Sequence, residues 1–143
     1  MWDLNVKSTF FLIKECKEML LKSVELSTAG KPNAANILVV SSVTGTNPTY
    51  TLGVYAATKA ALDNLIKSLA QELMDEGIRV NGISPGLIKT EFSGALWKKG
   101  APPEKSMGQA EHIASVVACI CSKQDGAFMN GETYLVHGGF AKI

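Results

Sequence analysis

Hydrophobic and polar positions follow two different patterns along this chain. Three segments place apolar side chains at helical spacing and predict helices, at residues 4–23, 53–76 and 109–122. Three short apolar runs predict strands, at residues 37–40, 78–84 and 131–136. Helices that alternate with strands are typical of an α/β fold, in which right-handed crossovers connect the strands of a parallel sheet.

The segments between these elements carry turn and loop signals. Gly77 follows the longest predicted helix and predicts a left-handed C-terminal cap. Pro85 and Gly86 turn the chain after the second strand. Polar loops are expected at 25–36, 42–52 and 126–130, and an irregular stretch at 87–108 that carries a short helix at 90–97.

Composition narrows the class of protein. A chain of 143 residues predicts one domain. Its net charge of +1 shows no excess of basic residues that would indicate nucleic-acid binding. No apolar run approaches the roughly 18 residues of a membrane helix. The start lacks the features of a signal peptide, and the end carries no peroxisomal address. We expect a cytoplasmic protein; peroxisomal or mitochondrial location stays open because the N-terminus can be missing.

The cysteines and histidines give no metal site. Cys16, Cys119 and Cys121 are odd in number and fall in predicted helices, so we expect buried free thiols in a reducing compartment. Neither of the two histidines is spaced from a cysteine pair as a zinc ligand would be. We expect no metal.

The candidate chemistry lies at the start of the longest helix. Tyr55 and Lys59 stand at i and i+4, on one helix face and roughly 5–6 Å apart at Cβ. An ammonium at that distance favours the phenolate, so the tyrosine can exchange a proton with an alcohol or carbonyl oxygen. Ser42 stands thirteen residues before Tyr55, at the end of a predicted buried strand, where its hydroxyl can hold the same oxygen.

Further motifs sharpen this pattern into a family resemblance. Asn5 lies in the run NVKSTFF, and the run NGISPGLIKT follows the second predicted strand. The order of these motifs around the serine and the Y-x-x-x-K pair resembles the short-chain dehydrogenase/reductase family. The run PGLIKTEFSGALW resembles carbonyl-reducing members related to dehydrogenase/reductase family member four and to tropinone reductases. The resemblance implies a Rossmann-like, doubly wound parallel sheet.

The resemblance also implies roles for four catalytic residues. Tyr55 would be the acid/base, Lys59 would tune it and bond the nicotinamide ribose, and Ser42 would hold the substrate oxygen. Asn5 resembles the asparagine that holds a water in the family's proton relay, although the Asn5–Ser42 separation is longer than usual. Ser41 is the alternative serine, less favoured because thirteen residues is the family's Ser-to-Tyr spacing.

A cofactor turn is implied by the same resemblance at Pro85, Gly86, Ile88 and Thr90. The Ile88 N–H would meet the nicotinamide carboxamide, and the Thr90 hydroxyl the carboxamide or phosphate. The implied reaction is hydride transfer between NADP(H) or NAD(H) and a carbonyl or alcohol substrate, with NADP(H) favoured on resemblance alone. His112 and His137 are expected to be structural or solvated. The segment after the turn is several residues shorter than the family's substrate lid.

One part of a dinucleotide fold is missing from the sequence. None of the 13 glycines forms G-x-G-x-x-G or the family variant G-x-x-x-G-x-G, which bind the pyrophosphate. We therefore interpret residues 1–143 as the C-terminal catalytic half of such a domain, with the N-terminal half absent. A truncated gene model, a splice form and a real short protein all fit.

Three hypotheses about activity stay open at this point. The chain descends from an enzyme whose activity it retains, or it is an inactive fragment that serves as an oligomerisation module. In the third hypothesis, a separate chain supplies the N-terminal half of the domain. The resemblance implies a homo-oligomer formed through the two long helices. We also expect marginal stability, because the first strand should pair with a strand that this chain does not contain.

Overall fold

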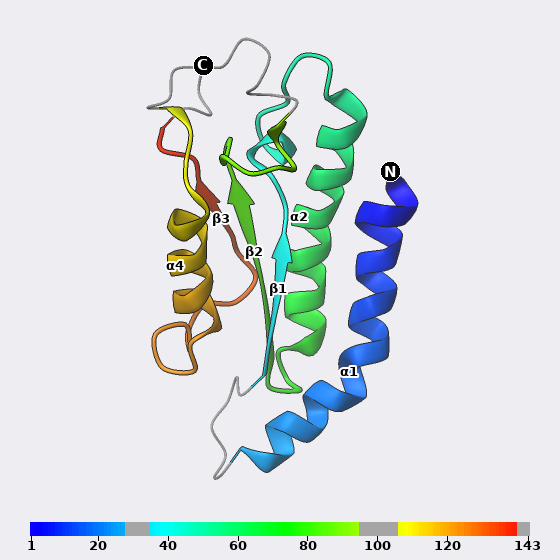
Figure 1. Cartoon of the computed structure of the whole chain (residues 1–143). Helices are drawn as coiled ribbons and strands as arrows, with labels where there is room; N and C mark the ends of the chain where they lie inside the picture. Colours follow the sequence, from blue (N-terminus) through cyan, green and yellow to red (C-terminus); the bar gives the residue numbers. More distant parts are fainter. Residues whose placement is uncertain (28–34, 95–105, 140–143) are drawn as a thin grey trace.

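Three parallel strands with helices on both sides form the core of the computed structural model, which describes residues 1–27, 35–94 and 106–139 (Figure 1). Along the chain the elements are η1 (Asp3–Lys7), α1 (Ser8–Leu26), β1 (Ala35–Val40), η2 (Val43–Gly45), α2 (Gly53–Leu73), β2 (Ile78–Pro85), α4 (Ala110–Cys121) and β3 (Thr133–Val136).

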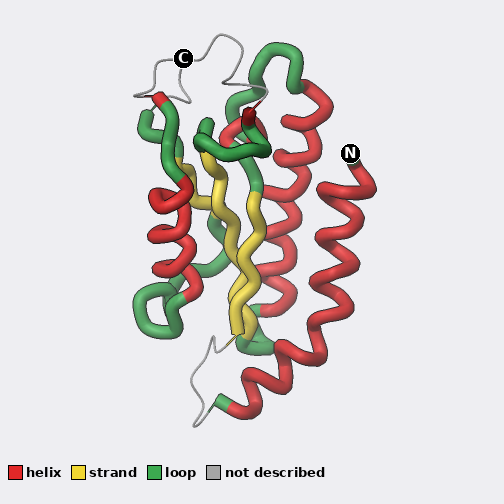
Figure 2. Tube along the Cα trace, viewed as in Figure 1, coloured by secondary structure: helices red, strands yellow, loops and turns green. Residues whose placement is uncertain are grey.

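The sheet has the order β1-β2-β3, and both strand pairs are parallel. Ala35 lies opposite Ile78 in the first pair, and Gly82 lies opposite Thr133 in the second. Figure 2 shows the three strands side by side between the helices. The predicted α/β fold with a parallel sheet is confirmed, and all three strands lie where the hydrophobic pattern placed them.

The face of the sheet towards α1 and α2 carries the hydrophobic core. Ile66 of α2 is 1% exposed and lies in one cluster with Ile78 and Val80 of β2. The predicted apolar stripe of α2 is confirmed, because Leu62, Ile66, Leu69 and Leu73 are buried and Leu65 packs against them. Burial of these side chains fixes the angle at which α2 crosses the sheet, and therefore the position of its first turn.

The opposite face, under α4, is more polar. Alternation along a strand turns Arg79 and Asn81 away from the α2 side. Arg79 is 1% exposed, and its guanidinium donates to the carbonyls of Met129 and Ile120 at 2.9 and 3.1 Å. The Asn81 amide donates to Met129 O at 2.6 Å. These bonds tie the segment after α4 to the middle of the sheet.

Several local predictions differ from the structure. The first helix begins as a π-helical turn, η1, and continues as α1 to Leu26, so it is longer than predicted. Cys119 and Cys121 are exposed, so their predicted burial is wrong; all three cysteines are free. Cys121 is exposed although its Sγ accepts from Asn36 Nδ2 of β1 at 3.4 Å, and the apolar and small residues around both cysteines in the sequence do not reveal this exposure.

Two further predictions concern turns. Gly77 has φ 75° and its N–H donates to Met74 O at 3.0 Å, so the left-handed end of the helix is confirmed. Of the short helix predicted at 90–97, residues 90–93 form a bend and a turn, residue 94 is helical, and 95–97 lie outside the described residues. Residues 95–105 of the 87–108 stretch and 28–34 of the loop predicted at 25–36 also lie outside the described residues.

Candidate active site

The candidate residues gather at one edge of the sheet. Parallel strands end at the same edge, and ligands of open α/β sheets bind outside these carboxyl ends. Ser42 follows the last residue of β1 by two positions, and Pro85 is the last residue of β2. The first turn of α2, which carries Tyr55, lies at this edge too (Figure 1).

Tyr55 and Lys59 meet as the helical spacing predicts. The Lys59 ammonium lies 5.6 Å from the centroid of the Tyr55 ring. It also donates to Val40 O at 2.9 Å, so the lysine is anchored to the end of β1. Burial lowers the pKa of Lys59, and attraction to Asp63 opposes this with the smaller effect.

Ser42 lies in the turn between β1 and α2. Its hydroxyl oxygen accepts from Thr44 N at 3.2 Å and from the Thr44 hydroxyl at 3.0 Å. Both contacts use the oxygen as acceptor, so the hydroxyl proton of Ser42 stays available for a ligand. The neighbouring Ser41 is buried and donates to Lys59 O at 3.2 Å, which gives it a structural role.

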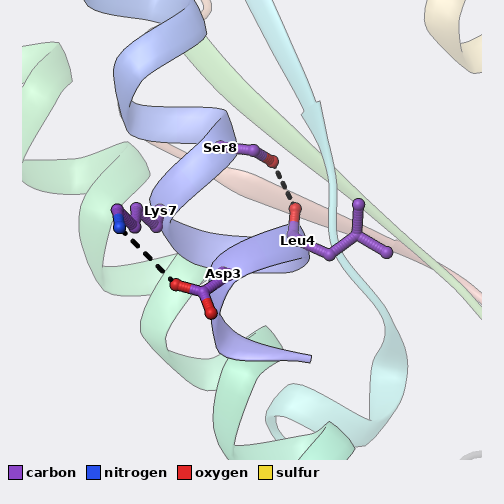
Figure 3. A network of polar contacts seen from close by, with 4 residues as sticks. All are labelled: Asp3, Leu4, Lys7 and Ser8. Atoms are coloured by element: carbon purple, nitrogen blue, oxygen red, sulfur yellow. Dashed lines mark hydrogen bonds and ion pairs between the residues drawn. The ribbon is translucent and has the colours of Figure 1, made fainter.

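Asn5 lies in the π-helical turn η1, against α2. Figure 3 shows the contacts that hold this turn: Lys7 lies 3.7 Å from Asp3, and the Ser8 hydroxyl donates to Leu4 O. The Ser8 N–H bonds to Asp3 O, as a π-helical turn requires. Single π-helical turns occur frequently at functional sites.

A chain of hydrogen bonds joins Asn5 to the start of α2. The Asn5 amide donates to the Thr58 hydroxyl at 3.0 Å, and that hydroxyl donates to Tyr55 O at 2.7 Å. These bonds hold Asn5 against α2 between Tyr55 and Lys59, and they end at the backbone carbonyl of Tyr55 rather than at its hydroxyl. Ser42 is joined to them through the backbone of β1, and no hydrogen bond links its side chain to Tyr55.

The predicted cofactor turn follows β2 at the same edge. Gly86 N donates to Val136 O at 2.9 Å, which fixes the turn to the end of β3. Ile88 forms an isolated parallel bridge with Gly108 that uses Leu87 O and Lys89 N, each at 2.9 Å. The N–H of Ile88 itself therefore points away from Gly108.

Two residues near this turn have structural roles. A Cβ on Gly86 would lie 2.8 Å from Cβ of His137, so packing against β3 already requires glycine there. His112 accepts from Gln109 N at 3.1 Å and caps the start of α4. His137 accepts from Gly139 N at 3.1 Å, and the expectation that both histidines are structural or solvated stays a prediction.

Three side chains near the site were not singled out from the sequence. Thr58, fully buried, links Asn5 to Tyr55. Ser93 is buried, and its hydroxyl bonds to Ile88 O and accepts from Thr90 N at 3.2 Å, which fixes the candidate cofactor turn. Asp63 lies one helical turn after Lys59. The two hydroxyl residues three positions apart, Thr90 and Ser93, are the sequence signal for such a turn.

Within the described residues, two further features bear on function. No three His, Cys, Asp or Glu side chains gather there as metal ligands. None of the described helices combines the length and the hydrophobicity needed to cross a membrane.

Fold and site together define a protein of the Rossmann class, with polar groups at the carboxyl edge of a parallel sheet. The family model described as enoyl-(acyl carrier protein) reductase matches residues 1–141. The chain is 37% identical to dehydrogenase/reductase SDR family member 4 of Bos taurus over 145 residues, which cover 96% of this chain and 48% of that protein. The chain belongs to the short-chain dehydrogenase/reductase family.

Solved structures agree with this assignment. ElxO with NADP bound has a TM-score of 0.79 at 26% identity and covers all of this chain and 57% of its own. The 3-ketoacyl-(acyl-carrier-protein) reductase of Brucella melitensis, complexed with NADH, has a TM-score of 0.83 over 98% of this chain and 56% of its own. Its identity of 23% supports the fold alone.

The chain spans about half the length of the curated relatives it matches. The resemblance to member four is confirmed by these relatives, whereas the relation to tropinone reductases stays a prediction.

Proposed function

We propose that residues 1–143 form the catalytic half of a nicotinamide-dependent carbonyl reductase or alcohol dehydrogenase. The observation that carries this proposal is the Lys59 ammonium, held between the Tyr55 ring and Val40 O at the carboxyl edge of the sheet. A lysine fixed in this way acts on the tyrosine in every turnover, because neither group has to be repositioned by the substrate.

The residues of the site have different roles in proton transfer. Tyr55 donates its hydroxyl proton to the carbonyl oxygen of the substrate during reduction and accepts it back during oxidation. Ser42 holds the same oxygen with the hydroxyl proton that its contacts with Thr44 leave available. Asn5, which Thr58 fixes, would hold the water of a proton relay, a role supported by the family resemblance.

The turn after β2 fits a nicotinamide group. When bound, the nicotinamide supplies or accepts the hydride. The Ile88 N–H points away from its bridge partner and is the donor for the carboxamide, and the Thr90 hydroxyl lies two residues on. Lys59 uses one of its three donors on Val40 O, which leaves donors for ribose hydroxyls. Pro85 and Gly86 set the path of this turn.

We favour NADP(H) over NAD(H) on the family resemblance alone, because among the similar structures ElxO holds NADP and the 3-ketoacyl-(acyl-carrier-protein) reductase of Brucella melitensis holds NADH. The substrate class is a small carbonyl compound or its alcohol. Cytoplasmic location is proposed on the sequence features alone.

The test is titration of the purified 143-residue chain with NADPH and NADH, followed by nicotinamide fluorescence. We expect saturable binding, tighter for NADPH, that Lys59→Ala weakens. Lys67→Ala is the matched control, because Lys67 is an exposed lysine two turns further along α2. Absence of binding up to millimolar concentrations would overturn the proposal for this chain by itself.

A second candidate function is an oligomerisation module without activity, and one feature favours it. A groove of about 440 Å³ runs between the first helical segment and α2, lined by Val6, Lys7, Phe10, Phe11, Ala61, Asn64, Leu65 and Ser68. Phe10 and Phe11 are 40% and 45% exposed. We infer that a second copy of the chain packs its own helices here, in a symmetric interface.

Size-exclusion chromatography with light scattering measures the mass of the chain in solution and so tests this interface. We expect a dimer, which Phe11→Lys converts to monomer, whereas Glu15→Lys on the same helix does not. A wild-type chain that is monomeric at every concentration would contradict the interface. A dimer that binds no nicotinamide would support the module rather than the enzyme.

A further inference from the structure

Asp63 carries a buried carboxylate that takes part in none of the hydrogen bonds described above. Both of its carboxylate oxygens are covered from solvent, and neither has a hydrogen-bond partner. A charged group held out of water without partners costs several kcal/mol, so its retention in a fold needs a compensating interaction. Asp63 lies one helical turn after Lys59 on α2.

The carboxylate packs against the turn that begins at Ser42. A Cβ built on Gly45 would lie 2.6 Å from Asp63 Oδ2 and 3.0 Å from the carbonyl carbon of Lys59. The backbone of Gly45 therefore lies directly on this part of α2. Gly45 N in turn donates to Ser42 O at 2.9 Å. The Asp63 carboxylate thus packs against the turn that follows Ser42.

The other charged groups near Lys59 are either absent from the neighbouring elements or already paired, so Asp63 is the counter-charge of Lys59. η2 and β1 contain no titratable side chain, and the Arg79 guanidinium of β2 bonds to carbonyls on the other face of the sheet. Asp3 and Lys7 of η1 pair with each other at 3.7 Å. Asp63 attracts the Lys59 charge and so opposes the effect of burial on its pKa.

We propose that Asp63 is a positioning residue, whose buried carboxylate one helical turn from Lys59 keeps that lysine protonated beside Tyr55. A carboxylate has no donor to compete for Val40 O, so it supplies charge without displacing the anchor of the lysine. The inference deepens the proposed function, on which the catalytic meaning of Lys59 rests.

The test measures the protonation of Lys59 directly in the full chain. Lysine side chains are labelled with ¹³C at Cε and titrated by NMR without cofactor or substrate, with Lys59→Met identifying the Lys59 signal. We expect Asp63→Asn, which keeps the shape of the side chain, to move the Lys59 midpoint to lower pH. Glu72→Gln, which removes an exposed carboxylate of the same helix, leaves the midpoint unchanged.

A double-mutant cycle keeps the proposal testable if Asp63→Asn weakens the fold. A counter-charge predicts that Asp63→Asn changes the unfolding midpoint much less in a Lys59→Met background than in the wild type. An unchanged Lys59 titration in Asp63→Asn, or additive effects in the cycle, would overturn the proposal. Neither measurement needs turnover, so a chain that binds no nicotinamide refutes the proposed function without deciding this one.

Discussion

The two faces of the sheet are held to their helices by different forces. Towards α2, apolar side chains of both layers are buried against one another, with Ile66 at the centre. Towards α4, Arg79 and Asn81 are buried and donate to carbonyls of the segment around Met129. Within α4, Ile120 is the one fully buried residue.

The difference explains where the candidate site can be built. Close packing of an apolar layer fixes α2 without demanding particular partners, so its first turn is free to carry polar groups. The α4 face depends on directed hydrogen bonds, in which the Arg79 and Asn81 side chains donate to backbone carbonyls. Catalytic positions are therefore expected on the α2 side, and structural polar positions on the α4 side.

The largest effect should come from the chemistry of the α2 side. Tyr55→Phe removes the proton donor and should lower kcat for a carbonyl substrate by about 100- to 10,000-fold. The unfolding midpoint should stay unchanged, because the ring remains. Tyr134→Phe on β3 is the control and should leave kcat unchanged. Retained turnover in Tyr55→Phe would remove the acid/base assignment.

Truncating a buried side chain in the apolar layer between α2 and the sheet should give the next largest effect, on the free energy of unfolding. Ile66→Ala leaves a cavity under α2 and should lower the free energy of unfolding by about 2–5 kcal/mol. Val117→Ala on the half-buried face of α4 should cost about 1 kcal/mol. Denaturant unfolding measures both. Equal losses would mean that the two faces contribute equally, against the comparison drawn from burial.

Removing the buried cation tests the polar face. Arg79→Met takes the donor from Ile120 O and should lower the free energy of unfolding by about 1.5–3 kcal/mol. Lys123→Met, at an exposed position after α4, should change little. A more stable Arg79→Met variant would show that burying the charge costs more than its hydrogen bonds return.

The smallest effects should appear as opposite slopes of stability with alkaline pH. Burial lowers the pKa of Lys59, so between that lowered value and the usual value of about 10.4 the unfolded chain binds more protons, and stability rises with pH. Burial, and secondarily Glu132, raises the pKa of Tyr134, so above about pH 10 the folded chain binds more protons, and stability falls.

Thermal unfolding across this pH range separates the two faces. Lys59→Met should remove the rise, and Tyr134→Phe should remove the fall. Identical pH profiles for wild type and Lys59→Met would mean that the lysine titrates normally in the folded chain.

The sequence predicted the elements well and the supports of the site poorly. Strand and helix periods are local, so the core of α2 and the cap at Gly77 followed from pattern alone. Arg79 stood inside a run predicted as an apolar strand, and nothing local showed that carbonyls some 40 or 50 residues later would receive its guanidinium. The exposure of Cys119 and Cys121 depends equally on what covers α4.

The pairing of Tyr55 with Lys59 was determined by the sequence itself, because residues four apart on a helix share a face in any fold that keeps the helix. The anchoring of Lys59 on Val40 O, 19 residues earlier, was decided by the tertiary structure. The same holds for the bond from Asn5 to Thr58, 53 residues apart. Hydrogen bonding and burial depend on which segments the sheet and its packing bring together, and that information is not carried by local spacing.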